Sequence, residues 1–103
     1  MAYIALVWFD WDPAKDDANH RKHGLGFDEA KELFLSGKPY LEAFDEGHSG
    51  TEDRFQAIGE IHRGIIVVVW TERSGDVIRI ISARFATKHE IERFRSYLEH
   101  HHE

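Results

Sequence analysis

The sequence contains no cysteine, only two prolines and a single methionine among 103 residues. Without cysteine the chain has no disulfide framework, no thiolate metal site and no cysteine nucleophile. No repeat or linker interrupts it, and the apolar segment at residues 4–9 is too short to cross a bilayer and lacks a basic leader. We therefore expect one compact domain held together by packing, in the cytoplasm and without a membrane partner.

Positive charge is also scarce, because 13 Lys and Arg residues face 19 Asp and Glu residues, a net charge of −6. Proteins that bind phosphate groups normally contain more basic than acidic residues, so the net charge argues against a nucleic-acid partner. The charge is unevenly distributed, however. Residues 1–53 contain 12 acidic and 5 basic residues, whereas residues 54–97 contain 5 acidic and 8 basic ones. An anion site, if there is one, belongs to the second half of the chain.

The chain ends in Leu-Glu-His-His-His-Glu, which looks like the remnant of a polyhistidine tag except for the final Glu103. Such a tag takes no part in folding. We therefore predict a single domain over residues 1–97 and treat residues 98–103 as a tag remnant.

The first half of the chain predicts two helices and two short strands. Asp12 offers an N-cap carboxylate, Pro13 suits the first helical position, and Gly24 is a typical C-terminal stop. The elements expected are helices over residues 13–23 and 27–35, strands over residues 9–11 and 39–44, and a disordered acidic loop over residues 45–53.

The second half predicts strands followed by a helix. The run from Ile65 to Trp70 is β-branched and apolar on both faces, which is typical of a central strand. Thr87 and Glu90 form a capping box that opens the last helix. The expected strands cover residues 55–61, 65–71 and 77–86. The fold class is therefore α+β: two N-terminal helices, an antiparallel sheet of about four strands and a short C-terminal helix.

Two arginines on the last predicted strand need an explanation. Arg79 interrupts an apolar strand, so it requires an acidic partner or access to a groove. A salt bridge, for example with Glu72 on the neighbouring strand, accounts for it without any function. Strict alternation points Arg79 and Arg84 to opposite faces of the sheet. A single site that uses both arginines therefore requires a β-bulge near Ser82 or a position at the strand's end.

The same region suits phosphate chemistry. Guanidinium groups bind phosphate oxygens bidentately and stay charged at any working pH. Arg54 adds a further guanidinium, and Lys88 adds positive charge on the last helix. Glu72 or His23 could move protons, the latter because a helix C-terminus favours the imidazolium form. This set suits a metal-independent ribonuclease in which the 2′-hydroxyl of RNA is the nucleophile, with no cofactor.

The remaining histidines and the tryptophans have simpler interpretations. His20 and His23 share a helix face, but two ligands without a carboxylate at fixed spacing do not make a metal site. Trp8, Trp11 and Trp70 are large enough to dominate a small core, and a base-stacking surface is the alternative.

Three motifs occur in order over residues 9–97: Phe9-Asp10-Trp11-Asp12-Pro13-Ala14-Lys15 with Asn19-His20-Arg21-Lys22-His23-Gly24, then Val67-Val68-Val69-Trp70-Thr71-Glu72-Arg73, then Arg79-Ile80-Ile81-Ser82-Ala83-Arg84. Together they resemble the BrnT toxin family, a family common in bacteria. The resemblance implies a RelE-like fold and ribonuclease activity that inhibits translation. It also implies a BrnA-type ribbon-helix-helix antitoxin as partner, with operator DNA contacted only through the toxin-antitoxin complex.

Carried over to this chain, the resemblance implies that Arg79 and Arg84 contact the phosphate and its transition state. Glu72 or His23 is then the group that transfers protons. The implied substrate-binding residues are Arg54, Arg73 and Ser82, to which we add Lys88 from the last helix. Phe85 stands where many relatives have an arginine, which predicts weaker RNA affinity or dependence on the ribosome.

Two other classes of function compete with this hypothesis. A non-catalytic interaction protein would bind an antitoxin or a transcription regulator while its arginines stay locked in structural salt bridges. Direct DNA binding is disfavoured, because no helix-turn-helix pattern is present and the first half is acidic.

Overall fold

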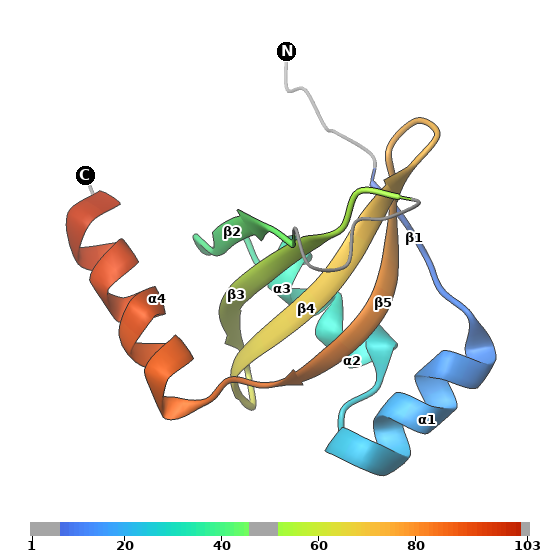
Figure 1. Cartoon of the computed structure of the whole chain (residues 1–103), viewed down its shortest axis with the longest axis horizontal. Helices are drawn as coiled ribbons and strands as arrows, with labels where there is room; N and C mark the ends of the chain where they lie inside the picture. The colour runs from blue at the N-terminus through green and yellow to red at the C-terminus, as the bar shows by residue number, and fades with distance from the viewer. Residues whose placement is uncertain (1–6, 46–51, 102–103) are drawn as a thin grey trace.

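The computed structural model describes residues 7–45 and 52–101, so residues 46–51 of the predicted acidic loop lie outside it. Figure 1 shows the arrangement of the elements along the chain. In chain order they are β1 (Trp8–Asp10), α1 (Pro13–His23), α2 (Phe27–Ala30), α3 (Glu32–Leu35), β2 (Leu41–Phe44), β3 (Phe55–Ile61), β4 (Gly64–Arg73), β5 (Val77–Phe85) and α4 (Lys88–His101).

The α+β class is confirmed, but the sheet is mixed and has five strands in the order β1-β5-β4-β3-β2. β2 to β5 form the expected antiparallel meander, whereas β1 pairs with β5 in parallel. The antiparallel arrangement of about four strands is confirmed for β2 to β5, and the parallel pairing of β1 was not predicted. Since helices and three strands separate β1 from β5 in the sequence, the connection is long enough for a parallel pairing that no local pattern reveals.

The first helix follows its sequence signals, and the second is divided. The carboxylate Oδ1 of Asp12 accepts from the backbone N–H of Ala14 at 2.9 Å, and Gly24 ends α1 with φ 68°. The predicted helix over residues 27–35 is split at Lys31, which separates α2 from α3. There the N–H of Phe34 bonds the carbonyl of Lys31 at 3.0 Å, the tighter three-residue spacing of a 3₁₀ turn.

The last helix begins where the capping box predicts. α4 has 14 residues and continues through residues 98–101, which the sequence analysis set apart. Thr87 and Glu90 make the reciprocal capping bonds, at 2.9 and 3.2 Å. Leu98 packs against the cluster around Phe94, which extends the apolar stripe of the helix. No helix within the described residues is long and apolar enough to cross a membrane.

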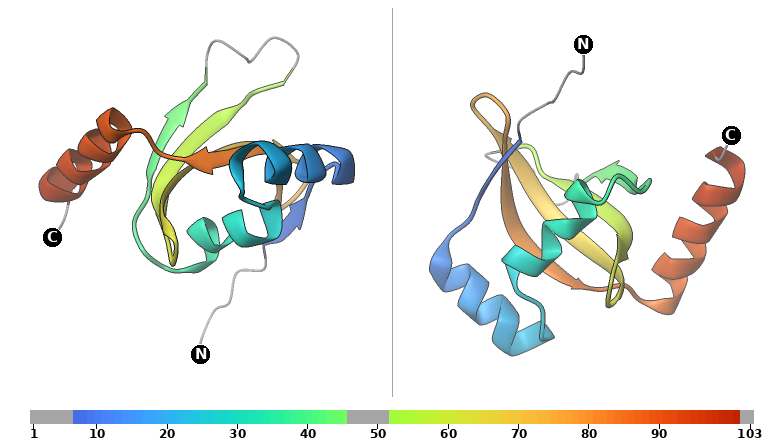
Figure 2. Two further views of the ribbon diagram at one scale, coloured as in Figure 1. Left: turned by 90° about the horizontal axis from the view of Figure 1, so that it is seen from below. Right: turned by 180° about the vertical axis from the view of Figure 1, so that it is seen from behind.

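The sheet has two different faces. α2 and α3 cover one face, as the view from behind in Figure 2 shows, and we call it the helical face. α4 lies on the other side and covers only part of it, through Phe94 against Ile58 and Val67. We call that side the open face. The main core lies on the helical face and contains Leu25, Phe27, Ala30, Leu33, Ala57, Ile61, Ile66, Val68, Trp70, Ile80 and Ala83.

A buried asparagine joins α1 to the edge of β5. β1 covers only residues 77–79 of that edge, and beyond them the side chain of Asn19 takes the place of a strand. Its Nδ2 donates to the carbonyl of Ala83 at 2.7 Å and to that of Leu25 at 2.8 Å. Its Oδ1 accepts from the N–H of Ala83 at 3.2 Å. The amide thus satisfies both ladder groups of Ala83, which would otherwise be buried without partners.

We predict that Asn19→Ala lowers the free energy of unfolding by on the order of 3 kcal/mol, because three buried backbone bonds lose their partner. Urea unfolding followed by circular dichroism measures the change. The control is Asp17→Ala on the exposed side of the same helix. Equal stability of the two variants would contradict this role of the amide.

Candidate functional site

A β-bulge lies in the middle of β5. Val69 pairs with Ser82, but the next residue of β4, Trp70, pairs with Ile80. Ile81 is therefore the extra residue that has no partner of its own. This is the bulge near Ser82 that a shared site for the two arginines requires.

The bulge changes which side chains of β5 face the core. Ile80 and Ala83 are both buried on the helical face, although they are three residues apart. Regular alternation would put them on opposite faces, so the bulge reverses the pattern between them. As a result Arg79 and Arg84 share the open face. Four regular steps along β5 correspond to about 13 Å between their Cα atoms.

Arg79 has an acidic partner on the open face, but not the predicted one. Its Nη1 donates to Oδ2 of Asp10 at 2.5 Å, and the register of β1 places the two residues side by side. The predicted partner, Glu72, pairs with Ile78 instead. Alternation therefore turns Glu72 toward the helical face. The contact with Asp10 uses one N–H group of the Arg79 guanidinium. The N–H groups that it does not use are able to bind an anion.

Arg84 is held more tightly. Its Nη1 and Nη2 donate to the two carboxylate oxygens of Glu90 at 2.7 and 2.9 Å, a bidentate pair. Arg84 and the capping bonds to Thr87 lower the pKa of Glu90 to about 2, against the opposing effect of burial. The hydrogen bonds that Arg84 donates to Glu90 also raise the pKa of Arg84. The pair ties α4 to the end of β5, so Arg84 has a structural task that Arg79 lacks.

The other predicted substrate-binding residues also lie toward the open face. Glu52 forms ion pairs with Arg73, at 3.4 Å from Nη2, and with Arg54, at 3.6 Å from Nε. Ser82 lies between Arg79 and Arg84 along β5 and is half-buried. Lys88 is exposed at the first position of α4. Five predicted positions on or beside one face thus carry guanidinium, hydroxyl or ammonium groups: Arg54, Arg73, Arg79, Ser82 and Lys88.

The two predicted proton-transfer groups lie elsewhere. His23 is the last residue of α1, and the carbonyl of the following Gly24 accepts from Arg63 at 3.1 Å. Arg63 in turn lies over the ring of Phe85, at the opposite end of β5 from Arg79. Glu72 is exposed and faces away from Arg79, as its pairing requires. Neither group is brought to Arg79 or Arg84, although Glu72 lines a pocket with Glu52, the partner of Arg54 and Arg73.

Sequence reasoning missed the carboxylates that accompany the arginines. Asp10, Glu52 and Glu90 each pair with at least one of them. The acidic excess of residues 1–53 was the available signal, since two of these three carboxylates come from that segment. Glu90 was recognised only as a helix cap. Among the described residues no group of three or more His, Asp or Glu side chains is arranged to hold a metal ion.

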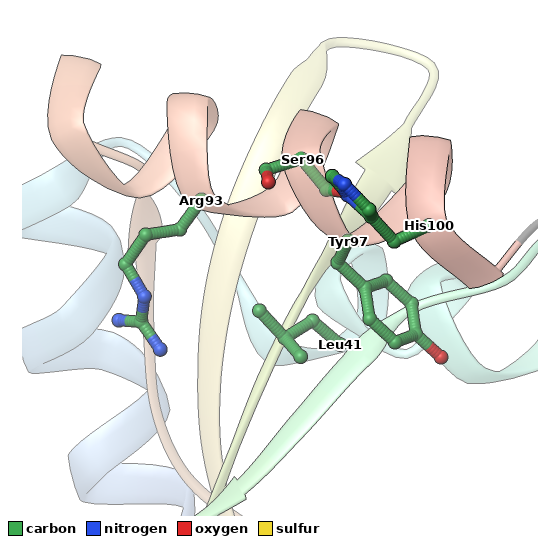
Figure 3. A pocket seen from close by; sticks show the side chains of 5 residues that line it. All are labelled: Leu41, Arg93, Ser96, Tyr97 and His100. Carbon is green, nitrogen blue, oxygen red and sulfur yellow. The ribbon is translucent and has the colours of Figure 1, made fainter.

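A separate pocket of about 330 Å³ lies between α4 and the edge strand β2 (Figure 3). None of the predicted site residues lines it. Nδ1 of His100 is 2.7 Å from the carbonyl of Ser96, within one turn of α4. The lining residues are Leu41, Arg93, Ser96, Tyr97 and His100.

Comparison with known proteins gives two findings. The family model described as the ribonuclease toxin, BrnT, of the type II toxin-antitoxin system matches residues 11–90. The crystal structure of the Brucella abortus ribonuclease toxin BrnT is similar, with a TM-score of 0.64 and 30% sequence identity over 81% of this chain and 100% of that chain. No curated protein matches the chain.

We predict that the Arg84–Glu90 pair makes stability depend on pH. Because the folded pKa of Glu90 is about 2 and its ordinary value is 4.5, the pair stabilises above pH 4.5 and loses its effect as the pH falls toward 2. Glu90→Gln keeps a side-chain oxygen that can accept from the backbone N–H of Thr87, but it removes the negative charge that pairs with Arg84. It should cost on the order of 2 kcal/mol at neutral pH, allowing for the partial exposure of Arg84, and the cost should disappear as the pH falls through and below the folded pKa of Glu90. Unfolding of both proteins at several pH values measures this difference, and a difference that does not change with pH would contradict it.

Proposed function

Because the chain belongs to the BrnT family of ribonuclease toxins of type II toxin-antitoxin systems, we propose that it cleaves RNA on its open face without a metal ion. The observation that carries the proposal is the bulge at Ile81, which puts Arg79 and Arg84 on a common face. The 2′-hydroxyl of RNA attacks the adjacent phosphorus, its proton passes to solvent, and the 5′-oxygen leaves with a proton from water. The products carry a 2′,3′-cyclic phosphate and a free 5′-hydroxyl.

In this proposal Arg79 is the principal phosphate contact. The guanidinium stabilises the extra negative charge of the pentacoordinate transition state through N–H groups that Asp10 leaves unoccupied. Arg54 and Arg73 attract the neighbouring phosphates, Ser82 lies between Arg79 and Arg84 on the open face, and Lys88 adds positive charge at the start of α4. Arg84 contributes positive charge while its bidentate pair with Glu90 holds α4. We assign no proton transfer to His23 or Glu72, because the contacts of both residues lie away from Arg79.

The family membership supports a wider setting. We propose that the cleaved RNA is used in translation, in the RelE-like manner, and that the protein acts in the cytoplasm. A ribbon-helix-helix antitoxin of the BrnA type would neutralise it, and operator DNA would be bound only by the complex. Co-purification with the product of a neighbouring gene, followed by gel shift of operator DNA with each component and with both, tests this part.

One observation favours the second candidate, a protein that binds an antitoxin but cleaves nothing. The side chains of Arg54, Arg73, Arg79 and Arg84 all lie within 4.0 Å of a carboxylate, as expected for arginines with structural tasks. Apart from the bidentate Arg84–Glu90 pair, these are single surface ion pairs, which exchange readily for a phosphate because each is worth little in water. The pairing therefore does not oppose catalysis, and an activity measurement separates the two candidates.

We predict that Arg79→Ala lowers kcat/KM for a single-stranded RNA oligonucleotide by roughly 100-fold or more, because the transition state loses its charged donor. Arg79→Lys should recover part of the rate. Addition of EDTA should leave the wild-type rate unchanged. Product analysis by gel electrophoresis and mass spectrometry identifies the 2′,3′-cyclic phosphate.

The control is Arg21→Ala, which removes an exposed arginine from α1, away from the open face. It should cleave like the wild type, and both variants should melt near the wild-type temperature. Equal activity of the wild type and Arg79→Ala, or no cleavage by either, would leave the interaction protein as the explanation.

A further inference from the structure

One tryptophan is exposed where the other two are packed. The side chain of Trp70 is buried in the core at 7% exposure, and Trp11 contacts Phe27 edge to face with ring centroids 6.1 Å apart. Trp8 is 65% exposed. A single exposed apolar residue is ordinary on a protein surface, so its meaning depends on what surrounds it.

Trp8 lies on the open face, next to the candidate phosphate contact. In the parallel pairing of β1 with β5, Trp8 faces Val77 and Asp10 faces Arg79. Residues two apart on a strand point to the same side, so Trp8, Asp10 and Arg79 share the open face. The backbone N–H of Trp8 donates to the carbonyl of Asp76 at 2.9 Å, which fixes the strand at this position.

No helix of residues 7–45 or 52–101 covers this corner of the open face. α4 packs against Ile58 and Val67. Ile58 pairs with Val67 and Val67 pairs with Arg84, so α4 covers the part of the sheet beside Arg84 and not the part beside Arg79. Figure 1 likewise shows β1 at one edge of the sheet and α4 beyond the other. The indole is thus held on an edge strand, about 7 Å along β1 from the carboxylate that orients Arg79.

An exposed indole beside a guanidinium matches the chemistry of an unpaired nucleotide. The indole stacks on a nucleobase of any identity, and the guanidinium binds the adjacent phosphate. Bases inside a duplex are already stacked on their neighbours and offer no free face. Asp10, Asp76 and Glu52 add negative charge nearby, which disfavours a long run of phosphate contacts and limits the match to one or two nucleotides.

We propose that Trp8 and Arg79 form a nucleotide subsite, in which Trp8 stacks on one base of single-stranded RNA while Arg79 binds the neighbouring phosphate. The proposal rests on the proposed function and adds to it the substrate class and a residue that binds without taking part in the chemistry. Trp8 is therefore a binding residue, and its removal should change KM rather than kcat.

The test compares Trp8→Ala and Trp8→Phe with the wild type on a single-stranded RNA oligonucleotide. Trp8→Ala should raise KM by roughly 10-fold, the usual effect of losing one stacking contact, with kcat within about twofold. Trp8→Phe keeps an aromatic face and should stay within about threefold of the wild-type KM. RNA should quench the tryptophan fluorescence of the wild type but not that of Trp8→Phe, because Trp11 and Trp70 are packed away from the open face.

The matched control is Leu35→Ala on α3, which removes an apolar side chain of similar exposure, 59%, from the other side of the molecule. It should leave KM and the quenching unchanged. The same RNA annealed to its complement should bind the wild type and Trp8→Ala equally weakly.

The possible results separate the two proposals. If Arg79→Ala loses cleavage while Trp8→Ala keeps the wild-type KM, the nucleotide subsite is overturned and the proposed ribonuclease function stands. A fall in kcat without a change in KM also overturns it, as does quenching that persists in Trp8→Phe. If the wild type neither cleaves nor binds RNA, the proposed function fails and the subsite fails with it. Melting temperatures near that of the wild type confirm that the variants are folded.

Discussion

The extra residue at Ile81 is the constraint on which both sides of the sheet depend. On the helical face it lets Ile80 and Ala83 enter the same core, and on the open face it brings Arg79 and Arg84 to one side. A strand without it would have to bury one arginine or expose one core residue, and either choice costs more free energy than one unpaired position in the ladder. Core packing and the arrangement of the basic residues therefore have the same cause.

Local signals in the sequence predicted local structure well. Asp12, Gly24 and the Thr87–Glu90 box mark helix ends through contacts within a few residues, and all are confirmed. The need for a bulge also followed from the sequence, because strict alternation made a shared site impossible. Contacts between distant segments were not predictable in this way. Asp10 reaches Arg79 from 69 residues away through a parallel strand, and no periodicity in either segment points to the other.

The distribution of charge along the chain has a structural explanation. The acidic first half supplies Asp10 and Glu52, and these carboxylates lie against arginines from the basic second half. Folding thus brings together charges that the sequence keeps apart, and the surface around β5 is closer to neutral than the sequence of residues 54–97 indicates. A phosphate that displaces Glu52 from Arg54 or Arg73 has an affinity that is the difference between two ion pairs and that falls with salt.

The side-chain amide of Asn19 has a consequence for how molecules of this protein meet. A sheet edge with free N–H and C=O groups is a template on which another chain can add a strand, the first step of many aggregation processes. At Ala83 both groups are already engaged by the buried Asn19, and an incoming strand would have to displace α1 to reach them. This stretch of β5 is thereby closed to intermolecular pairing without needing a sixth strand.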